Sequence, residues 1–452
     1  MNIENIIARL PAGLPRYTSY PPANHFQAGV GRSLSTAFVN AVEAAPHVSV
    51  YMHIPFCDRL CWFCGCHTKH TLRYEPIQAY VQSLIGEIGI WGSKLAKKPA
   101  MSRLHLGGGS PSLLREAELK ALREALESVF AFNADTEISV EIDPSDIGEG
   151  QIENLARFGL TRASIGVQDF DPAVQAAINR PQSFEATRDV VQALRRAGVT
   201  SVNIDALYGL PLQTLERLQQ TISQVISLTP DRIALFGYAH VPWLKTHQRM
   251  IRDEDLPDTP ARYVQARTAS EDIQAAGYQA IGIDHFALPN DSLAVATREG
   301  RLHRNFQGYT DDTASVLLPL GASSVGRFED GYIQNEVPTG QYLSRIEAGE
   351  LPFSRGLALV AEDHVRSFII ERLMCDYAFC LSEVQSRFGA QSRAALAHGH
   401  KVADEMLPDL CEISDGMFKV KPDAWPLVRV VASKFDTWIV ETAEKPQYSK
   451  AV

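Results

Sequence analysis

The feature that most constrains this chain is a cysteine-rich stretch, Tyr51–Cys66, which reads YMHIPFCDRLCWFCGC. Four of the seven cysteines fall in its last ten residues, namely Cys57, Cys61, Cys64 and Cys66. Thiolates this close together favour one metal centre over several disulfide bridges. Zinc sites usually take ligands from two separated pairs, whereas three thiolates on one tight loop suit an iron–sulfur cubane whose fourth iron stays open. An open metal position is typical of a catalytic site.

Two questions stay open at this level. The cysteines could instead form a buried cluster without a bound group, or an adventitious zinc site. Spacing alone also allows Cys66 to replace Cys64 as the third ligand.

The pattern C-x-x-x-C-x-aromatic-C after a short apolar strand resembles the signature of the radical S-adenosylmethionine (SAM) enzymes. In that superfamily the open iron chelates the amino and carboxylate groups of SAM. Electron transfer from the cluster then cleaves the sulfonium to methionine and a 5′-deoxyadenosyl radical. The resemblance implies the same chemistry for this chain.

From residue 48 onward, short apolar runs alternate with amphipathic stretches. The predicted strands are 48–54, 102–106, 136–142, 161–167, 199–205, 231–238 and 278–283. The predicted helices lie near 75–97, 115–130, 148–158, 183–197, 214–228 and 259–276. This alternation predicts an α/β fold of βαβ units with parallel strands, which is a partial or closed (β/α) barrel over residues 47–350.

Polar residues follow each predicted strand. After the cysteine loop they are Gly107–Pro111, Glu141 with Asp143, Gln168 with Asp169, Asp205, Tyr238–His240, and Asp284 with His285. A barrel places its active site at the C-terminal ends of its strands, so we expect the site there.

Three consecutive glycines, Gly107–Gly109, follow the second strand. Glycine lets the backbone approach a ligand closely, and N–H groups after a strand can bind a carboxylate or an amino-acid backbone. The segment resembles the one that holds the methionine amino group in radical SAM enzymes, and a plain tight turn is the alternative. Glu141 suits a ribose hydroxyl or the SAM amino group, with a strand-end salt bridge as the alternative.

Both ends of the chain differ from this pattern. Residues 1–46 are rich in Pro and Gly and predict an irregular N-terminal arm without a signal peptide. Its segment Arg16–Pro22 is either a surface arm or a flap over the site, and we expect it to contribute to turnover rather than to folding. Residues 351–452 predict a small, mainly helical, winged-helix-like domain with helices at 362–378, 381–408 and 425–441 and a hairpin at 410–420. The domain lacks a basic stripe, which favours a lid or docking surface over DNA binding.

The net charge of −10, from 43 basic and 53 acidic residues, disfavours binding to nucleic acid or anionic membranes. No apolar run reaches the length of a membrane span, and the scattered remaining cysteines suggest a reducing, cytoplasmic location. An anionic substrate then requires a locally basic pocket. The candidate cations are Arg16, Arg301, Arg304 and Arg327, with His240, His285 and His303 as further candidates. His53 and His105 lie in predicted strands, where we expect them to support neighbouring side chains.

Ten motifs in order resemble the oxygen-independent coproporphyrinogen III oxidase (dehydrogenase) family of haem biosynthesis. They are RYTSYP, the cysteine stretch, LHLGGGSPS, SVEIDP, GVQDF, Asn179-Arg180, NIDALYGLP, YAHVP, GIDHFA and HRNFQGYT, and the match extends to the terminal QYSKAV. The family implies that Cys57, Cys61 and Cys64 hold a [4Fe–4S] cluster and that Cys66 is not a ligand. It also implies oxidative decarboxylation of two propionates of coproporphyrinogen III to vinyl groups, which gives protoporphyrinogen IX.

The family further implies two SAM molecules in one site. The residues for the SAM on the cluster are Tyr51, Phe63, Gly108, Glu141 and Val325. Those for the second are Gly109, Ser110, Gln168, Arg180, Asp205 and Ala239, with Phe306 and Gln307 nearby. Arg180 would pair with a methionine carboxylate, and we expect it to lie away from the cysteine loop. The segment Gly321–Gly326 (GASSVG) departs from the family's G-x-S-A-I-S type around Val325.

Two alternative functions share this signature, a haem-acting ring-opening methyltransferase and a non-catalytic haem chaperone. The chaperone relatives usually lack Cys66, the RYTSYP arm and the FQGYT segment, all present here. The expected partners are coproporphyrinogen III and an electron donor and acceptor that this chain does not encode. We expect a monomer.

Overall fold

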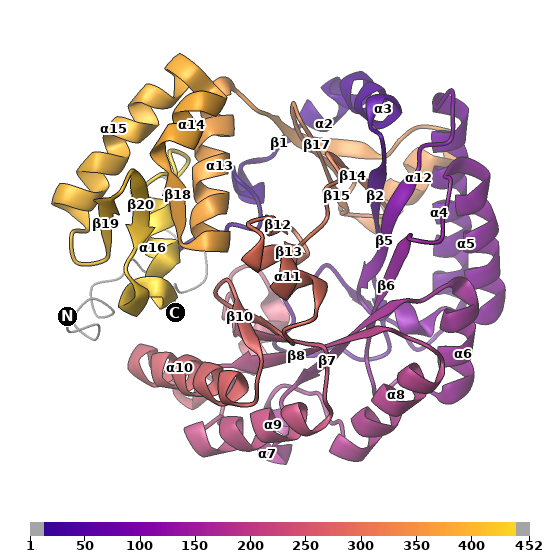
Figure 1. Cartoon of the computed structure of the whole chain (residues 1–452). Coiled ribbons are helices and arrows are strands. Elements are labelled where there is room, and N and C mark those ends of the chain that lie inside the picture. The colour runs from indigo at the N-terminus through magenta and orange to yellow at the C-terminus, as the bar shows by residue number, and fades with distance from the viewer. Residues whose placement is uncertain (1–12, 440–452) are drawn as a thin grey trace.

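The computed structural model describes residues 13–439 (Figure 1). Its centre is a 13-stranded sheet in the order β1-β17-β16-β15-β14-β2-β5-β6-β7-β8-β9-β11-β10. Figure 1 shows this sheet curving as an open arc, with helices α4, α5, α6, α8, α9 and α10 around its outer face. The expected partial (β/α) barrel is confirmed.

Seven neighbouring strands of the sheet are parallel. They are β14 (Val316–Leu320), β2 (Val48–Ile54), β5 (Met101–Gly108), β6 (Glu137–Ile142), β7 (Arg162–Gln168), β8 (Ser201–Tyr208) and β9 (Arg232–Gly237). The outer helices are α4 (Glu75–Lys94), α5 (Glu116–Val129), α6 (Glu149–Phe158), α8 (Phe184–Arg196), α9 (Leu215–Ser227) and α10 (Thr259–Ala275). Each predicted strand and helix of the barrel is present, with ends shifted by a few residues.

The prediction that the seventh strand runs parallel to the others is wrong. It is β10 (Gln279–Ile281), which pairs antiparallel with β11 (His285–Ala287), and β11 pairs antiparallel with β9. The link between β10 and β11 is too short for the crossover that parallel strands require. The hairpin therefore ends the parallel series.

The outer helices form because their apolar residues repeat at helical spacing. In α9, Leu218, Ile222 and Val225 are fully buried, and Thr214 caps the helix by accepting a hydrogen bond from the Arg217 N–H. Strand β2 buries six of its seven residues because helices cover one face and barrel contents the other.

The N-terminal segment is less irregular than its composition indicates. Val30–Ser33 form α2 and Ser35–Ala44 form α3, so the expectation of an irregular stretch to residue 46 is wrong there. Phe38 of α3 is buried, with its ring 5.9 Å from the Trp91 ring and 5.7 Å from the Phe353 ring. Apolar residues one turn apart, Phe38 and Val42, attach the helix to the main core.

The sheet also continues beyond β14 in antiparallel strands. These are β15 (Val325–Phe328), β16 (Gly331–Asn335), β17 (Phe353–Ala358) and the short β1 (Gln27–Ala28), with α12 (Thr339–Glu347) before β17. The main sheet thus includes residues past the boundary expected at position 350.

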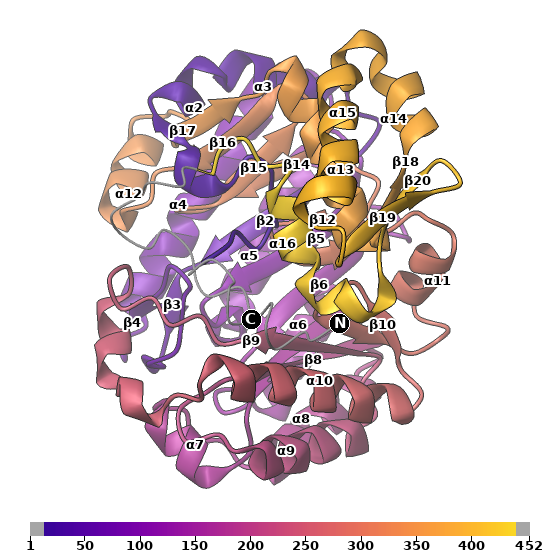
Figure 2. The ribbon, with the colours of Figure 1, turned by 90° about the vertical axis from the view of Figure 1, so that its left-hand side faces the viewer.

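The C-terminal unit lies at the open side of the arc in Figures 1 and 2. It contains α13 (Ala361–Asp376), β18 (Ala378–Cys380), α14 (Leu381–Phe388), α15 (Arg393–Lys401), β19 (Cys411–Ser414), β20 (Met417–Val420) and α16 (Val428–Ser433). The antiparallel order β18-β20-β19 confirms the hairpin, and Phe379, Phe418 and Phe435 form its core. The last helix is shorter than the predicted 425–441, and 440–452 lie outside the described residues.

The RYTSYP segment is part of the fold and not a surface arm. Leu14, Tyr17 and Tyr20 are buried in the apolar core of the C-terminal unit. The Tyr17 hydroxyl donates to Asp436 Oδ2 at 3.1 Å. The premise that nothing anchors this segment in a core is therefore wrong.

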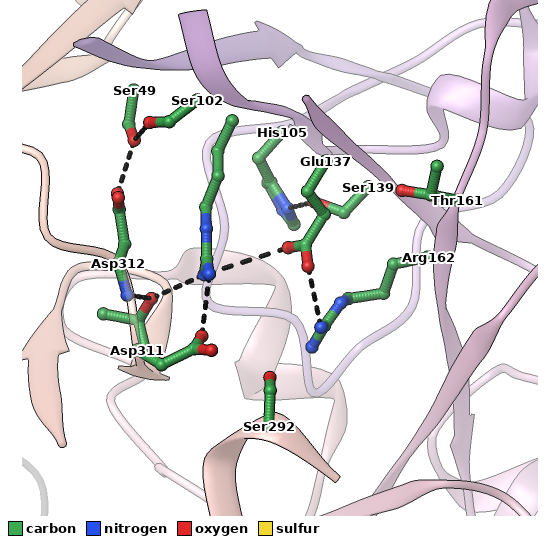
Figure 3. Close-up of polar contacts among 12 residues, drawn as sticks. Ser49, Ser102, His105, Glu137, Ser139, Thr161, Arg162, Ser292, Asp311 and Asp312 are labelled. Atoms are coloured by element: carbon green, nitrogen blue, oxygen red, sulfur yellow. Dashed lines mark hydrogen bonds and ion pairs between the residues drawn. The ribbon is translucent and has the colours of Figure 1, made fainter. Parts of the chain in front are cut away.

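The N-terminal ends of the strands are closed by ion pairs (Figure 3). Arg103 of β5 contacts Asp311 at 2.8 Å, and Arg162 of β7 contacts Glu137 of β6 at 2.8 Å. Asp311 follows α11 (Ser292–Arg298), β12 (His303–Asn305) and β13 (Gly308–Thr310) in the chain. Within residues 13–439, no helix combines the length and apolar character needed to cross a bilayer.

Candidate functional site

The cysteine loop leaves the C-terminal end of β2. It begins with β3 (Phe56–Cys57), which pairs with β4 (Lys69–His70) and so closes the loop on itself. Cys61 is buried, Cys57 and Cys64 are half-buried, and Cys66 is exposed. The Cys66 N–H donates to Cys64 Sγ at 3.4 Å. Cys66 therefore differs from the other three cysteines of the loop in being exposed.

The donor set fits an iron–sulfur cluster. Burial raises the pKa of Cys57 to about 12, while a hydrogen bond from the Cys66 thiol lowers that of Cys64 to about 6. Metals bind the thiolate. Burial raises the pKa of Cys61, and the Arg180 guanidinium, 3.4 Å from Cys61 Sγ, acts against that rise. No three His, Cys, Asp or Glu side chains of residues 13–439 converge on one metal position. Each cysteine of a cluster binds its own iron, so the three sulfurs need not converge.

The resemblance implied that Arg180 lies away from the cysteine loop. This expectation is wrong. Arg180 Nη1 also contacts Asp143 Oδ2 at 2.8 Å, and Nη2 donates to the Gly166 carbonyl at 2.6 Å. Its buried Nε has no partner among the described residues. The position follows from Asn179, whose backbone has φ 54° and whose side chain donates to the Leu60 carbonyl at 2.9 Å. This turn holds Arg180 against the loop.

The glycine segment acts differently from the expected N–H cradle. The Gly108 N–H donates to Glu141 Oε2 at 2.8 Å, and those of Gly109 and Ser110 donate to the carbonyls of Ile54 and Phe56. Their N–H groups are thus already used. A Cβ at Gly108 would lie 2.2 Å from the His53 ring, and one at Gly109 would lie 2.4 Å from the Phe56 carbonyl oxygen. Glycine is required because the segment packs directly on the start of the cysteine loop.

Glu141 is held in place by a histidine. His105 Nε2 lies 3.2 Å from Glu141 Oε1, and His105 Nδ1 lies 2.5 Å from Ser139 Oγ. Burial alone would raise the pKa of Glu141, but the hydrogen bond and charge of His105 and the Gly108 N–H lower it overall. The Tyr51 ring stacks on His105 with centroids 5.7 Å apart. Tyr51, Gly108 and Glu141 therefore come together, as the sequence predicted.

The supporting role expected for the two strand histidines is confirmed. His105 contacts Ser139 and Glu141, as above. His53 Nε2 lies 2.8 Å from the His67 carbonyl, and burial lowers its pKa to about 4. A neutral His53 thus ties the end of β2 to the far side of the cysteine loop.

A second group of predicted residues gathers around Gly166. Asp205 pairs with Gly166 across β7 and β8, and its carboxylate accepts from Ser164 Oγ at 3.1 Å and Asn203 Nδ2 at 2.7 Å. Burial raises the pKa of Asp205 to about 6. Gln168 ends β7 in a left-handed conformation with φ 69°. Because Arg180 binds the Gly166 carbonyl, Gln168, Arg180 and Asp205 share one corner of the barrel.

Sequence reasoning missed the loop that follows β9. Gln248 is buried and its Nε2 donates to the carbonyls of Phe63 at 2.9 Å and Ala239 at 3.1 Å. Lys245 Nζ donates to the Cys66 carbonyl at 2.8 Å, and His247 Nε2 lies 2.8 Å from the Cys64 carbonyl. This loop clamps the cysteine loop through its backbone. The segment LKTHQRM has no periodicity or motif, so only the adjacent YAHVP pointed towards it.

The remaining predicted residues lie farther along the sheet. Phe306 and Val325 pack in an apolar cluster with Phe26 and Tyr332, where the Phe306 and Tyr332 rings are 5.9 Å apart. Gln307 lines a separate cavity of about 120 Å³ inside the barrel. These residues are not brought onto the cysteine loop itself.

The candidate cations separate into two kinds. Arg301 is exposed and paired with Glu299, and Arg327 donates to the Ala314 carbonyl at 3.4 Å. Arg304 and Arg16 instead adjoin each other, since Arg304 Nη2 donates to the Arg16 carbonyl at 3.3 Å. The three candidate histidines each contact a carboxylate: His240 with Asp253, His285 with Asp284 and His303 with Glu371.

Comparison with known proteins gives a match to a family and to individual relatives. Residues 51–225 match the family described as the Radical SAM superfamily. A Cereibacter sphaeroides protein named "Coproporphyrinogen III oxidase, anaerobic 1" is 44% identical over 97% of each chain. A Paracoccus denitrificans protein named "Oxygen-independent coproporphyrinogen III oxidase" is 45% identical over 94% of each.

A solved structure has the same architecture. The coproporphyrinogen III oxidase of Escherichia coli, described as a radical SAM enzyme, superposes with a TM-score of 0.88 at 37% identity. The superposition covers 94% of this chain and 98% of that one.

Proposed function

This chain belongs to the oxygen-independent coproporphyrinogen III oxidase family of radical SAM enzymes, and from that premise we propose that it converts coproporphyrinogen III to protoporphyrinogen IX without oxygen. The observation that carries the proposal is the cysteine loop, whose buried Cys61 faces Arg180 at the C-terminal end of a partial barrel. Its cofactors are a [4Fe–4S] cluster on Cys57, Cys61 and Cys64, and SAM.

The reaction has a fixed atom and electron balance. Each of two propionate side chains loses CO2, one hydrogen atom from its β-carbon and one electron, and becomes a vinyl group. When bound, the cluster and SAM supply the radical chemistry that removes the hydrogen atom. An external donor must reduce the cluster and an acceptor must take the final electron.

The chain's own residues position and shield this chemistry. Tyr51, Gly108 and Glu141 form one polar corner, and the ionised Glu141 can accept from a ribose hydroxyl or an ammonium group. Trp62 and Phe63 pack in an apolar cluster with Tyr238, which keeps water from the loop. Gln248, Lys245 and His247 fix the loop backbone and so its sulfurs.

We extend the proposal to two SAM molecules in one site. Support comes from the two separate corners, one around Glu141 and one around Gly166 with Gln168, Arg180 and Asp205. The buried Nε of Arg180, which lacks a partner in residues 13–439, is a donor suited to a methionine carboxylate. Phe63, Gly109, Ser110, Ala239, Phe306, Gln307 and Val325 complete the proposed contacts.

The proposal includes a monomeric protein in a reducing, cytoplasmic compartment. All seven cysteines are free thiols, as such a compartment maintains them.

The test is an anaerobic incubation of the reconstituted protein with SAM, dithionite and coproporphyrinogen III, followed by mass spectrometry. We expect two decarboxylations per substrate, each accompanied by one 5′-deoxyadenosine. Conversion of haem instead would identify the methyltransferase alternative. Haem binding without SAM cleavage would identify the chaperone alternative.

A further inference from the structure

A second cavity, of about 330 Å³, lies at the C-terminal ends of β8 and β9. Tyr208 and Gly237 line it from the strand ends, α10 forms one wall, and Trp425 and Arg429 of the C-terminal unit form another. Figures 1 and 2 both place α16 across from α10 on this side of the molecule. The cavity is therefore shared between the barrel and the C-terminal unit.

Four arginines from distant parts of the chain converge on this cavity, namely Arg16, Arg262, Arg304 and Arg429. Arg16 Nη2 donates to the Gly237 carbonyl at 2.7 Å and Arg262 Nη2 to the Tyr238 carbonyl at 3.0 Å. Arg429 Nε donates to the Pro15 carbonyl at 3.1 Å. These bonds orient the side chains, but carbonyl groups do not neutralise their charge.

Among the described residues that line the cavity, carboxylates are fewer than arginines. The acids that line it are Glu271, which lies 3.7 Å from a fifth arginine, Arg267, and Asp284. Asp284 Oδ2 lies 3.6 Å from Arg304 Nη2, and its other oxygen contacts His285 at 2.7 Å. Among the described residues, Asp284 is thus the carboxylate that faces Arg304, and its charge also acts on Arg16.

Three of the four arginines have lowered pKa values, whereas the pKa of Arg304 is raised because the effect of its burial is outweighed by those of Tyr309 and Asp284. Burial, followed by repulsion from Arg16, lowers the pKa of Arg429 to about 10. Burial also lowers the pKa of Arg16 and Arg262, and a neighbouring arginine adds to the effect in each case. An anion in the cavity would relieve this repulsion.

Arg304 has unused donors. Its side chain is buried with the guanidinium 4.3 Å from the centre of the Tyr309 ring. Its Nε and Nη1 have no hydrogen-bond partner among residues 13–439. Leaving charged donors buried and unpaired costs free energy, which an anionic ligand would recover.

The cavity is also close to the cysteine loop. Tyr238 lines the cavity and packs in the same apolar cluster as Trp62 and Phe63 of that loop. Tyr238 therefore borders the cavity and belongs to the cluster against which the cysteine loop packs. A large ligand with one of its groups bound in the cavity could therefore extend to the cysteine loop.

We propose that this arginine-lined cavity binds a propionate carboxylate of the tetrapyrrole substrate and so orients the macrocycle towards the cysteine loop. The inference rests on the proposed function, since the substrate supplies the carboxylate. The volume lies at the small end of the range of about 300–1,000 Å³ for ligand pockets, which suits a side-chain edge and not the whole macrocycle. Two of the four propionates survive the reaction, so one can stay bound throughout.

The test measures binding of coproporphyrin III, the oxidised analogue with four propionates, to the reconstituted full chain under anaerobic conditions. Arg304→Gln and Arg16→Gln should each raise the Kd about tenfold to a hundredfold, as expected for loss of a charge-assisted bond. Arg301→Gln is the matched control, because that arginine is exposed and paired with Glu299, and its Kd should be unchanged. With the tetramethyl ester of coproporphyrin III, wild type and variants should bind alike.

Bound iron and melting temperature monitor folding of each variant. If Arg304→Gln loses iron or melts early, Arg16→Gln decides. Wild-type Kd in a folded glutamine variant of Arg304 or Arg16 overturns the proposal, and so does a change in SAM affinity with unchanged porphyrin affinity. A wild-type chain that fails to convert coproporphyrinogen III refutes the proposed function itself, whereas conversion together with unchanged variant Kd refutes only the cavity assignment.

Discussion

Two groups of arginines, one at each end of the main sheet, differ in how they are paired. At the N-terminal ends of the strands, Arg103 and Arg162 each contact a carboxylate, Asp311 and Glu137 respectively (Figure 3). In the arginine-lined cavity at the C-terminal ends, the acids among the described lining residues are Asp284, which faces Arg304, and Glu271, which faces Arg267. The residue type is the same, and the difference lies in whether the protein supplies the opposite charge.

This difference separates structural from ligand-binding charge. A neutralised ion pair closes the barrel and needs nothing further from solution. An uncompensated cluster costs folding free energy that only a ligand returns, so a protein keeps it where it binds one. The comparison predicts that changes at the C-terminal end mainly affect ligands, and changes at the N-terminal end mainly affect stability.

The largest expected effect is loss of the cluster. Cys61→Ser should abolish bound iron after anaerobic reconstitution, because Cys61 is the buried cysteine beside Arg180. SAM cleavage should disappear with the iron. The measurements are iron content and 5′-deoxyadenosine formed with dithionite.

Two other cysteines serve as controls for this variant. Cys66→Ser and Cys380→Ser should both keep their iron, because Cys66 is exposed on the loop and Cys380 lies in the C-terminal unit. Loss of iron in Cys66→Ser with retention in Cys64→Ser would reassign the third ligand to Cys66.

The second prediction concerns Tyr17, the neighbour of Arg16 in the chain, which has a structural role and so does not follow the rule for ligand-binding residues. Tyr17→Ala should destabilise the protein by about 3–5 kcal/mol, as for other large-to-small changes of buried aromatic residues. Its ring is buried in the core of the C-terminal unit and its hydroxyl bonds Asp436. The melting temperature should fall by more than for Tyr17→Phe, which keeps the ring. Equal melting of Tyr17→Ala and wild type would restore the surface-arm interpretation.

The third prediction concerns the opposite end. Arg103→Ala should cost about 2 kcal/mol, because it leaves Asp311 without its cation, whereas Glu137 keeps Arg162. The cost is limited because a quarter of the Arg103 side chain is exposed to water. Thermal unfolding should show a drop of several degrees. Lys120→Ala removes an exposed i,i+4 pair with Glu124 and should change little. A folded Arg103→Ala protein with weakened coproporphyrin III binding would contradict the comparison.

The sequence predicted the barrel because apolar periodicity reports burial, and parallel strands and their helices are built from local patterns. The grouping of Tyr51, Gly108 and Glu141, together with Phe63 and Val325, came from the family resemblance, and the structure brings the first three together. The sequence did not predict that Arg180 contacts Cys61, since that contact depends on the left-handed turn at Asn179. The arginine cavity was equally hidden, because Arg16 and Arg429 meet only after the two ends of the chain pack together.

The smallest expected effect is at Asp205, where one substitution should change stability and SAM binding in opposite directions. Its folded pKa is raised from 3.8 to about 6, chiefly by burial, so the folded state binds more protons than the unfolded state between these values. Stability from this group is therefore fully present below about pH 4 and is lost as the pH rises to about 6. Asp205→Asn should remove that slope, since an amide can accept from Asn203 and donate to Ser164 without a charge to desolvate.

The amide must still be buried, so the gain at neutral pH should be on the order of 1 kcal/mol. The measurement is the melting temperature of the apo protein from pH 4 to pH 8 for wild type and Asp205→Asn. The two curves should converge at low pH, with the variant more stable at neutral pH, while its SAM affinity falls because an amide accepts fewer hydrogen bonds than a carboxylate. A variant less stable than wild type at pH 7 would show that the ionised Asp205 stabilises the fold. At this position the charge at the C-terminal strand ends would then stabilise the fold, as the ion pairs at the N-terminal strand ends do.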